Sequence, residues 1–198
     1  MNKIYFATTN SGKVSSLNSA LKQYDIVAEQ VDIELPEPRS DNIREIARAK
    51  VGYAYEKIGK PCVALDAGFY IDSLNGFPKT FVNSALDTIG IEGILKLVED
   101  KERTCEFREC LAFKDYEMDG PLYFESSTRG TLATEPRGER KDKRWSDLHL
   151  VFIPEGREKT IAEMTDEEHD FWRSERGENH FSKRFAKWVH DQRKYDTR

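Results

Sequence analysis

Residues 4–14 read IYFATTNSGKV, and this stretch decides the fold. Residues 4–7 form a short apolar run that is typical of a buried strand, and Asn10-Ser11-Gly12 is typical of a turn. Helical spacing then relates Val14, Leu17, Leu21 and Tyr24. A strand, a turn and a helix in this order predict one unit of an α/β protein.

Further helices and one more buried strand follow from the same periodicities. Residues 41–58 predict a second helix that Gly59-Lys60-Pro61 ends, and residues 62–65 predict a buried strand. A third helix is expected around residues 91–98, and an amphipathic helix around residues 181–189.

The remaining segments predict a sheet with polar connections. Alternation over residues 104–113 indicates a half-exposed strand, antiparallel to others near residues 122–124 and 148–153. The charge-dense residues 137–144 are expected to form an exposed loop or strand edge, and residues 166–178 an acidic loop with some helix. The sum is a mixed α/β fold, with a central sheet flanked by helices.

The composition describes one ordinary folded domain over residues 1–198. The chain carries 31 Lys and Arg against 36 Asp and Glu, and its three cysteines fit a reducing compartment. No apolar stretch approaches the roughly 18 residues of a membrane span, and the chain enters its first strand without a leader pattern, so we expect a cytoplasmic protein without a membrane partner. A net charge of -5 disfavours binding to long nucleic acid, although a few cations can still hold a small anion.

Lys13 lies where a cation is disfavoured, in the first turn of the expected helix and next to the positive end of its dipole. An anion between the ammonium and the free N–H groups would remove that conflict. The preceding residues supply hydrogen-bond donors and a close backbone approach: Thr8, Thr9, Asn10, Ser11 and Gly12. The pattern indicates a phosphate-binding loop that is not a Walker loop, and a surface lysine after an ordinary loop is the alternative.

Lys50 falls within the apolar stripe of the helix expected over residues 41–58. Its ammonium points toward the core and needs an anionic partner, unless the stem lies along the sheet with its head in water. Glu45 lies on the opposite side of the helix, as a solvated or structural carboxylate.

Two carboxylates are candidates for the same site. Asp66 follows residues 62–65, at the expected carboxyl end of a buried strand, where α/β proteins bind ligands. Burial there would raise the pKa of a carboxyl group and a metal would keep it ionised, while turn chemistry before Gly68 is the alternative. Glu37, between two prolines, is a second candidate ligand for a hard cation or an exposed loop residue.

Two lysines and one or two carboxylates around a cleft suit Mg²⁺-assisted attack of water on a polyphosphate. The cations neutralise charge on the phosphate oxygens, while a carboxylate orients the water. The residues by themselves therefore indicate a hydrolytic site for a small polyphosphate.

The chain resembles the inosine triphosphate pyrophosphatase family, the Ham1-like enzymes that remove noncanonical purine nucleotides. The resemblance covers nearly the whole length through short motifs in a shared order and spacing. The motifs are residues 8–13 (TTNSGK), 35–37 (LPE), 45–50 (EIA-x-x-K), 66–78 (D-x-G and then L-x-G-x-P), 90–93 (G-x-x-G) and 160–164 (T-x-AEM).

This resemblance implies an elongated two-lobed α/β fold with a nucleotide cleft between the lobes, usually as a homodimer. Such an enzyme hydrolyses ITP, dITP or XTP to the monophosphate and pyrophosphate with Mg²⁺. By matching position, Lys13 and Lys50 would hold phosphates. Asp66 would bind the metal and activate water, and Glu37 would be the further metal ligand.

The resemblance also assigns the contacts to the base, where the chain departs from the family pattern. Residues 144–147 (RWSD) stand at F-G-[YW]-D, so Trp145 stacks on the base or packs, with Asp147 beside it. Residues 178–184 (ENHFSKR) stand at K-N-x-x-S-H-R. There Lys183 and Arg184 are the expected contacts, and His180 is either a substitute ligand or a surface residue.

Three differences from the family leave the substrate open. Leu65 stands where the family commonly has another acid, Ala67 replaces a hydroxyl residue beside the phosphates, and residues 170–177 look inserted. The alternatives to an ITP pyrophosphatase are a hydrolase of the same fold with a shifted nucleotide substrate, and a nucleotide-binding module with little turnover.

Overall fold

A computed structural model describes residues 2–140 and 146–196, so the prediction for Trp145 lies outside the described residues. The chain divides into two compact units. The first holds the described residues up to Asp66, Glu109–Ser126 and those from Gly177 onward, and the second holds Ala67–Arg108 and the described part of Ser127–Arg176. The expectation of one domain over the whole chain stays a prediction.

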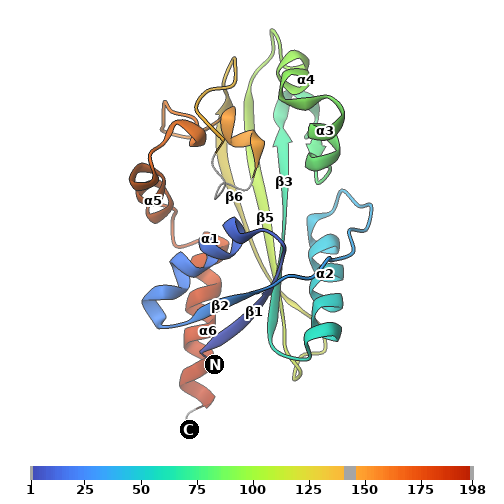
Figure 1. The fold of residues 1–198 in the computed structure, drawn as a ribbon, viewed down its shortest axis with the longest axis vertical. Coiled ribbons are helices and arrows are strands. Elements are labelled where there is room, and N and C mark those ends of the chain that lie inside the picture. Colours follow the sequence, from blue (N-terminus) through green and yellow to red (C-terminus); the bar gives the residue numbers. More distant parts are fainter. Residues whose placement is uncertain (1, 141–145, 197–198) are drawn as a thin grey trace. The chain divides into compact units, whose positions relative to one another are not determined.

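The strands form a mixed sheet, which confirms the predicted fold class. Their order is β2-β1-β3-β5-β6-β7, with β4 paired to β3 (Figure 1). β1 is parallel to β2 and β3, whereas the pairs β3–β4 and β6–β7 are antiparallel. The strand bounds are β1 Lys3–Ala7, β2 Val27–Val31, β3 Cys62–Ile71, β4 Pro78–Lys79, β5 Thr104–Lys114, β6 Leu122–Leu132 and β7 Phe152–Pro154.

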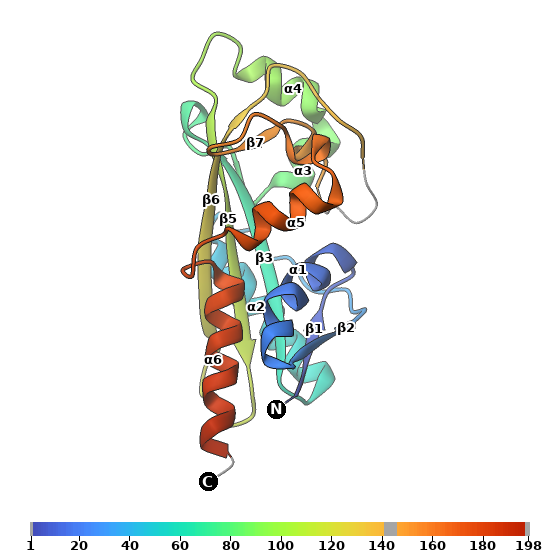
Figure 2. The same cartoon turned by 90° about the vertical axis from the view of Figure 1, so that its left-hand side faces the viewer.

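Helices cover both faces of the sheet in the first unit. On one face lie α1 (Ser11–Leu21) and α6 (Phe181–Asp196) (Figure 2). Their large buried side chains, such as Leu17 and Phe185, belong to one core cluster with Ile4. On the other face lies α2 (Ile43–Ile58), and its cluster consists largely of alanine and cysteine: Ala7, Ala47, Val51, Ala54, Cys62, Ala64, Cys110 and Ala112. Small side chains let a helix approach its sheet closely, so α2 lies near the backbone of β1 and β3.

The second unit has an aromatic core. The ring of Phe107 lies 4.8 Å from the rings of both Phe69 and Phe152, between centroids. Residues of its helices join this cluster, among them Leu95 and Trp172. The helices are α3 (Val82–Thr88), α4 (Gly90–Leu97) and α5 (Asp166–Ser174). Short 3₁₀ helices in the chain are Lys22–Tyr24, Asp72–Leu74, Asp147–Leu150 and Ile161–Glu163.

The strand expected to end near Leu65 is longer than predicted. β3 continues to Ile71 with almost every residue buried, so Asp66 lies in the middle of this strand and not at its end. The neighbouring strand explains the error, because β1 pairs with β3 only at Cys62 and Val63. Beyond Val63 the strand goes on without β1 and pairs with β4 at Phe69 and Tyr70.

Two other strand predictions were wrong in detail. β5 is almost wholly buried, because it lies between β3 and β6 in the sheet, and Arg108 alone in it is exposed. The strand expected at residues 148–153 is shorter, since a 3₁₀ helix occupies Asp147–Leu150 before β7 begins.

The helix boundaries differ less from the prediction than the strand boundaries do. The predicted turn at Asn10-Ser11-Gly12 is a helix start, with Asn10 as the N-cap. α2 begins at Ile43 and is ended by Gly59, whose φ of 63° suits a glycine. The acidic segment after Asp166 is mostly helix.

Candidate active site

Backbone and side-chain hydrogen bonds fix the loop that leads into α1. Thr8 donates its N–H to the carbonyl of Val31 at 3.1 Å, and its Oγ1 accepts the N–H of Asn10 at 3.1 Å. The side chain of Asn10 accepts the N–H of Lys13 at 3.2 Å. Thr9 and Ser11 are exposed and Gly12 is buried, and whether these residues contact a nucleotide stays a prediction.

The ammonium of Lys13 turns toward the backbone of β3. Its Nζ lies 3.5 Å from the carbonyl oxygen of Leu65, two residues beyond the last pairing of β1 with β3. Burial lowers the pKa of Lys13, and repulsion by Lys50 adds to this effect, while Asp66, Glu37 and Glu109 oppose it. An anionic ligand would relieve a cation in this state.

Lys50 is the centre of an ion-pair cluster, which confirms that its ammonium has anionic partners. Its Nζ donates to Oδ1 of Asp66 at 2.6 Å and to Oε1 of Glu37 at 2.8 Å. The side chains of Lys50 and Asp66 are 8% and 9% exposed, whereas that of Glu37 is 66% exposed. Burial alone would lower the pKa of Lys50, but the two carboxylates outweigh burial and raise it. The hydrogen bond from Lys50 lowers the pKa of Glu37.

Glu37 and Asp66 form a donor set that fits a hard divalent cation. Both offer carboxylate oxygens, and both oxygens lie within hydrogen-bond distance of the same positively charged nitrogen. Mg²⁺ is typically held by one or two carboxylates together with substrate phosphates and water. Within residues 2–140 and 146–196, no group of three or more His, Cys, Asp and Glu side chains is arranged to hold a metal, so phosphates and water would complete the shell.

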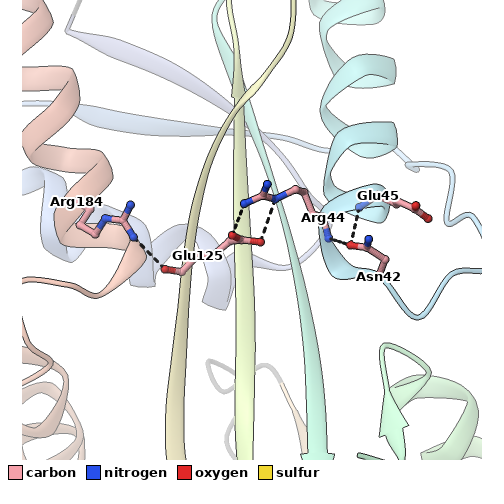
Figure 3. A network of polar contacts seen from close by, with 5 residues as sticks. All are labelled: Asn42, Arg44, Glu45, Glu125 and Arg184. Carbon is pink, nitrogen blue, oxygen red and sulfur yellow. Dashed lines mark hydrogen bonds and ion pairs between the residues drawn. The ribbon is translucent and has the colours of Figure 1, made fainter.

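The predicted base contacts at the start of α6 are held by other parts of the first unit. Arg184 is exposed, and its Nη1 donates to the backbone carbonyl of Glu125 at 3.3 Å (Figure 3). Nζ of Lys183 lies 3.5 Å from Oε1 of Glu178, a residue whose side chain is 87% exposed. Contact of either cation with a base stays a prediction.

Glu125 also joins α6 to the start of α2. Its carboxylate accepts two hydrogen bonds from Arg44, at 2.6 and 3.3 Å (Figure 3). The guanidinium of Arg44 lies over the ring of Tyr123, 4.9 Å from its centroid, and Asn42 caps the same helix. Glu45 is exposed and accepts a hydrogen bond from Ser40, which agrees with the solvated or structural carboxylate that was expected.

The other predicted contacts lie in the second unit. Asp147 begins a 3₁₀ helix and pairs with Nη2 of Arg140 at 2.7 Å. Ala67 follows Asp66 within β3. Their place in a nucleotide site stays a prediction.

Sequence reasoning missed two buried polar residues. His180, for which a surface position was one reading, is only 5% exposed, and Glu109 is 6% exposed. A signal for Glu109 existed, because it falls in the same alternation phase as Cys105, Phe107 and Leu111. No comparable signal marks His180, since its burial depends on a strand about seventy residues earlier.

The mixed sheet and the lysine and carboxylate cluster define an α/β protein with a polar site suited to an anionic ligand. Residues 4–179 match the model of the Ham1 family, and the chain belongs to this family. It is 41% identical over 168 residues to the dITP/XTP pyrophosphatase of Methanopyrus kandleri, covering 84% of this chain and 86% of that protein. It is 35% identical over 195 residues to the dITP/XTP pyrophosphatase of Pyrococcus horikoshii, and this match covers 98% of this chain and 100% of that protein.

Solved structures agree on the fold. The HAM1 protein of Coxiella burnetii superposes with a TM-score of 0.73 at 21% identity, over 98% of this chain and 100% of that one. The Ham1 protein of Staphylococcus aureus superposes with a TM-score of 0.68 at 20% identity, over 98% and 99%. The fold expected from the sequence is thereby confirmed, and the cleft between lobes stays a prediction.

Proposed function

We propose that this protein is a nucleoside triphosphate pyrophosphatase that hydrolyses noncanonical purine nucleotides, namely ITP, dITP and XTP, to the monophosphate and pyrophosphate. The observation that carries the proposal is the buried Lys50, bonded at once to Asp66 and Glu37 beside a second desolvated lysine, Lys13. Relatives at 41% and 35% identity named dITP/XTP pyrophosphatase support the reaction and the substrate class.

In this proposal the two lysines hold the phosphates. Lys13 lies in the first turn of α1 and burial lowers the pKa of its ammonium, so a phosphate oxygen bound there would stabilise its charge. Lys50 keeps its charge, because its pKa is raised. The two cations stabilise the negative charge that develops on the leaving pyrophosphate.

Asp66 is the proposed catalytic carboxylate. It is buried and acceptor-only when ionised, so it can orient a water molecule and take up its proton. The oxygen of that water bonds to the α-phosphorus, and the bond from this phosphorus to the bridging oxygen breaks. Pyrophosphate leaves with the bridging oxygen, and the proton of the water passes to the carboxylate.

Glu37 and Asp66 are the proposed ligands of the metal, which we take to be Mg²⁺. When bound, Mg²⁺ supplies charge neutralisation on the phosphate oxygens and lowers the pKa of coordinated water. Glu37 is exposed and stays ionised to a lower pH than an ordinary glutamate, which suits a ligand that meets an incoming ion. Chelation with EDTA should abolish turnover and added Mg²⁺ should restore it.

A pyrophosphate-release assay with ITP, dITP, XTP, ATP and GTP tests the proposal. We expect turnover of the first three at least about tenfold above the last two. Turnover of a different nucleotide alone would point to the same-fold hydrolase with a shifted substrate. Saturable binding without product would point to the nucleotide-binding module.

The proposal extends to assembly and location. We propose a cytoplasmic homodimer, as the family resemblance implies. Among the described residues, none of the helices combines the length and the apolar character that a membrane span needs. Light scattering after size exclusion should give about twice the chain mass of 22.9 kDa.

A further inference from the structure

Side-chain hydrogen bonds join the strand β2 to the helix α1, and the proposed reaction does not use them. β2 begins the strand order and pairs with β1, and α1 lies beside it (Figure 1, Figure 2). The N–H of Val27 bonds to the carbonyl of Asn2 on the β1 side, so the backbone groups of the next residue, Ala28, point away from β1. Outward groups of this kind on an edge strand need another partner.

Asn18 of α1 bonds to both backbone groups of Ala28. Its Nδ2 donates to the carbonyl oxygen of Ala28 at 2.9 Å, and its Oδ1 accepts the N–H of Ala28 at 2.7 Å. The carboxamide offers one donor and one acceptor side by side, as the backbone of a further strand would. Because one planar group makes both bonds, they fix the position of α1 along β2 as well as its distance from the strand.

The other end of β2 holds the loop that precedes α1. Thr8 donates its N–H to the carbonyl of Val31 at 3.1 Å, and its own carbonyl accepts Nε2 of Gln30 at 2.9 Å. From Thr8 the hydrogen bonds continue through Asn10 to the N–H of Lys13, at 3.1 and 3.2 Å. A continuous series of hydrogen bonds therefore links β2 to the backbone of Lys13.

Lys13 and Asn18 lie on the same helix of 11 residues, so a shift of α1 along β2 moves both of them. The Nζ of Lys13 lies 3.5 Å from the carbonyl oxygen of Leu65 in β3. A shift of about 1 Å would take this ammonium out of hydrogen-bond range of that oxygen. Misplacement of a binding group by about the same distance is enough to weaken its action on a substrate.

We propose that Asn18 is a positioning residue that locks α1 to β2 and thereby sets where the ammonium of Lys13 meets the phosphates of the substrate. Gln30 supports it by holding the loop at Thr8. The inference rests on the proposed function, in which Lys13 holds phosphates. Asn18 acts through Lys13, so its loss should weaken phosphate binding more than it slows the chemical step at Asp66.

Hydrogen exchange tests the lock itself. Asn18→Ala removes the carboxamide and leaves a good helix former. The matched control is Ser19→Ala, because the hydroxyl of Ser19 donates to the carbonyl of Ser15 within α1, at 3.0 Å. In the protein without ligand, the amide of Ala28 should exchange at least about tenfold faster in Asn18→Ala, as NMR would show, and at the wild-type rate in the control.

Binding of inorganic tripolyphosphate tests the positioning. Calorimetric titration should show its affinity weakened roughly fivefold in Asn18→Ala and unchanged in Ser19→Ala. KM for ITP should rise by a similar factor, with kcat changed by less than about twofold. A residue that only stabilised the fold would lower the midpoint of unfolding and leave the affinity of the folded protein unchanged. In a Lys13→Met background Asn18→Ala should cause no further loss of affinity.

The outcomes separate this inference from the proposed function. Unchanged tripolyphosphate affinity in Asn18→Ala, or an equal loss in the Lys13→Met background, would overturn the positioning role. Failure of the wild-type protein to hydrolyse any of the triphosphates, with tripolyphosphate still bound, would overturn the proposed function alone.

If Asn18→Ala does not fold, Gln30→Ala takes its place. Its matched control is Gln23→Ala, because Nε2 of the exposed Gln23 donates to the carbonyl of Ala20, three residues earlier, at 3.1 Å. Gln30→Ala should weaken the binding of tripolyphosphate about twofold, since it removes one hydrogen bond of the series. Equal affinity of these two variants would overturn the inference.

Discussion

At the scale of single residues, the ion pair of Lys50 and Asp66 connects stability with the proposed catalysis. Both side chains are nearly buried, and their charged atoms are 2.6 Å apart. Removal of one charge leaves the other buried without a partner or hydration. This loss destabilises the protein strongly, even where the intact ion pair is no more stabilising than a pair of apolar side chains. Because the pKa of Lys50 is raised, its ion pair stabilises the fold fully below pH 10.5, the pKa of an ordinary lysine. This contribution is lost as the pH rises through the pKa of Lys50 in the folded protein.

Asp66→Asn should therefore lower both the activity and the stability of the protein. Pyrophosphate release should fall at least about a hundredfold, because the proposed catalytic carboxylate is gone. The free energy of unfolding at pH 7 should fall by about 3 kcal/mol in urea titrations. Nucleotide binding should remain measurable, since both lysines are kept. Asp72→Asn, at an exposed ion pair with Arg129, is the control, and wild-type turnover in Asp66→Asn would refute the mechanism.

Lys13→Met should change stability and binding in opposite directions, with a more stable fold and weaker binding of triphosphate. Its ammonium is desolvated and its pKa lowered, so we expect the substitution to raise the free energy of unfolding at pH 7 by about 1 kcal/mol. That gain should narrow as the pH rises through the lowered pKa, because neutral lysine no longer carries the cost. Isothermal titration should show triphosphate binding weakened roughly tenfold or more. The same substitution at the exposed Lys22 should do neither.

At the scale of elements, β6 and β7 leave no room for a side chain at Gly130. Gly130 pairs with Pro154, and a Cβ atom at this position would lie 2.3 Å from the carbonyl oxygen of Ile153. Because that neighbour is backbone, it cannot move aside cheaply.

Gly130→Ala should consequently lower the free energy of unfolding by about 2 to 3 kcal/mol in chemical denaturation. Gly120→Ala is the matched control, since a Cβ atom there meets nothing within 4 Å. Equal stability of the two variants would contradict the register of β6 and β7.

The elements also show how far the sequence predicts the site. Lys13 and Lys50 were predictable, because each breaks a rule of the helix that carries it. The true length of β3 was not, because the sequence shows where a strand is buried but not where its neighbour stops. The burial of His180 was missed for a related reason: it depends on Glu109, far away in the chain.

At the scale of the whole molecule, the three cysteines are free and buried in the sheet. Burial raises the pKa of Cys62 and of Cys110 to about 12, and that of Cys105 further. Thiolates are the reactive form. The folded protein should thus resist a maleimide at pH 8 and take up three equivalents after denaturation, as intact mass spectrometry would show. Rapid labelling of the native protein would contradict the burial of these residues.

The layer of alanines beneath α2 has a consequence for how this enzyme can change in evolution. Ala47 and Ala54 occupy the gap in which a longer side chain would lift the helix from the strands. Lifting the helix would draw the ammonium of Lys50 away from Asp66. A longer apolar side chain at Ala47 or Ala54 would therefore lower the proposed activity without altering any polar group. Drift in this buried packing is therefore constrained by the chemistry of Lys50, which lies on the same face of the helix.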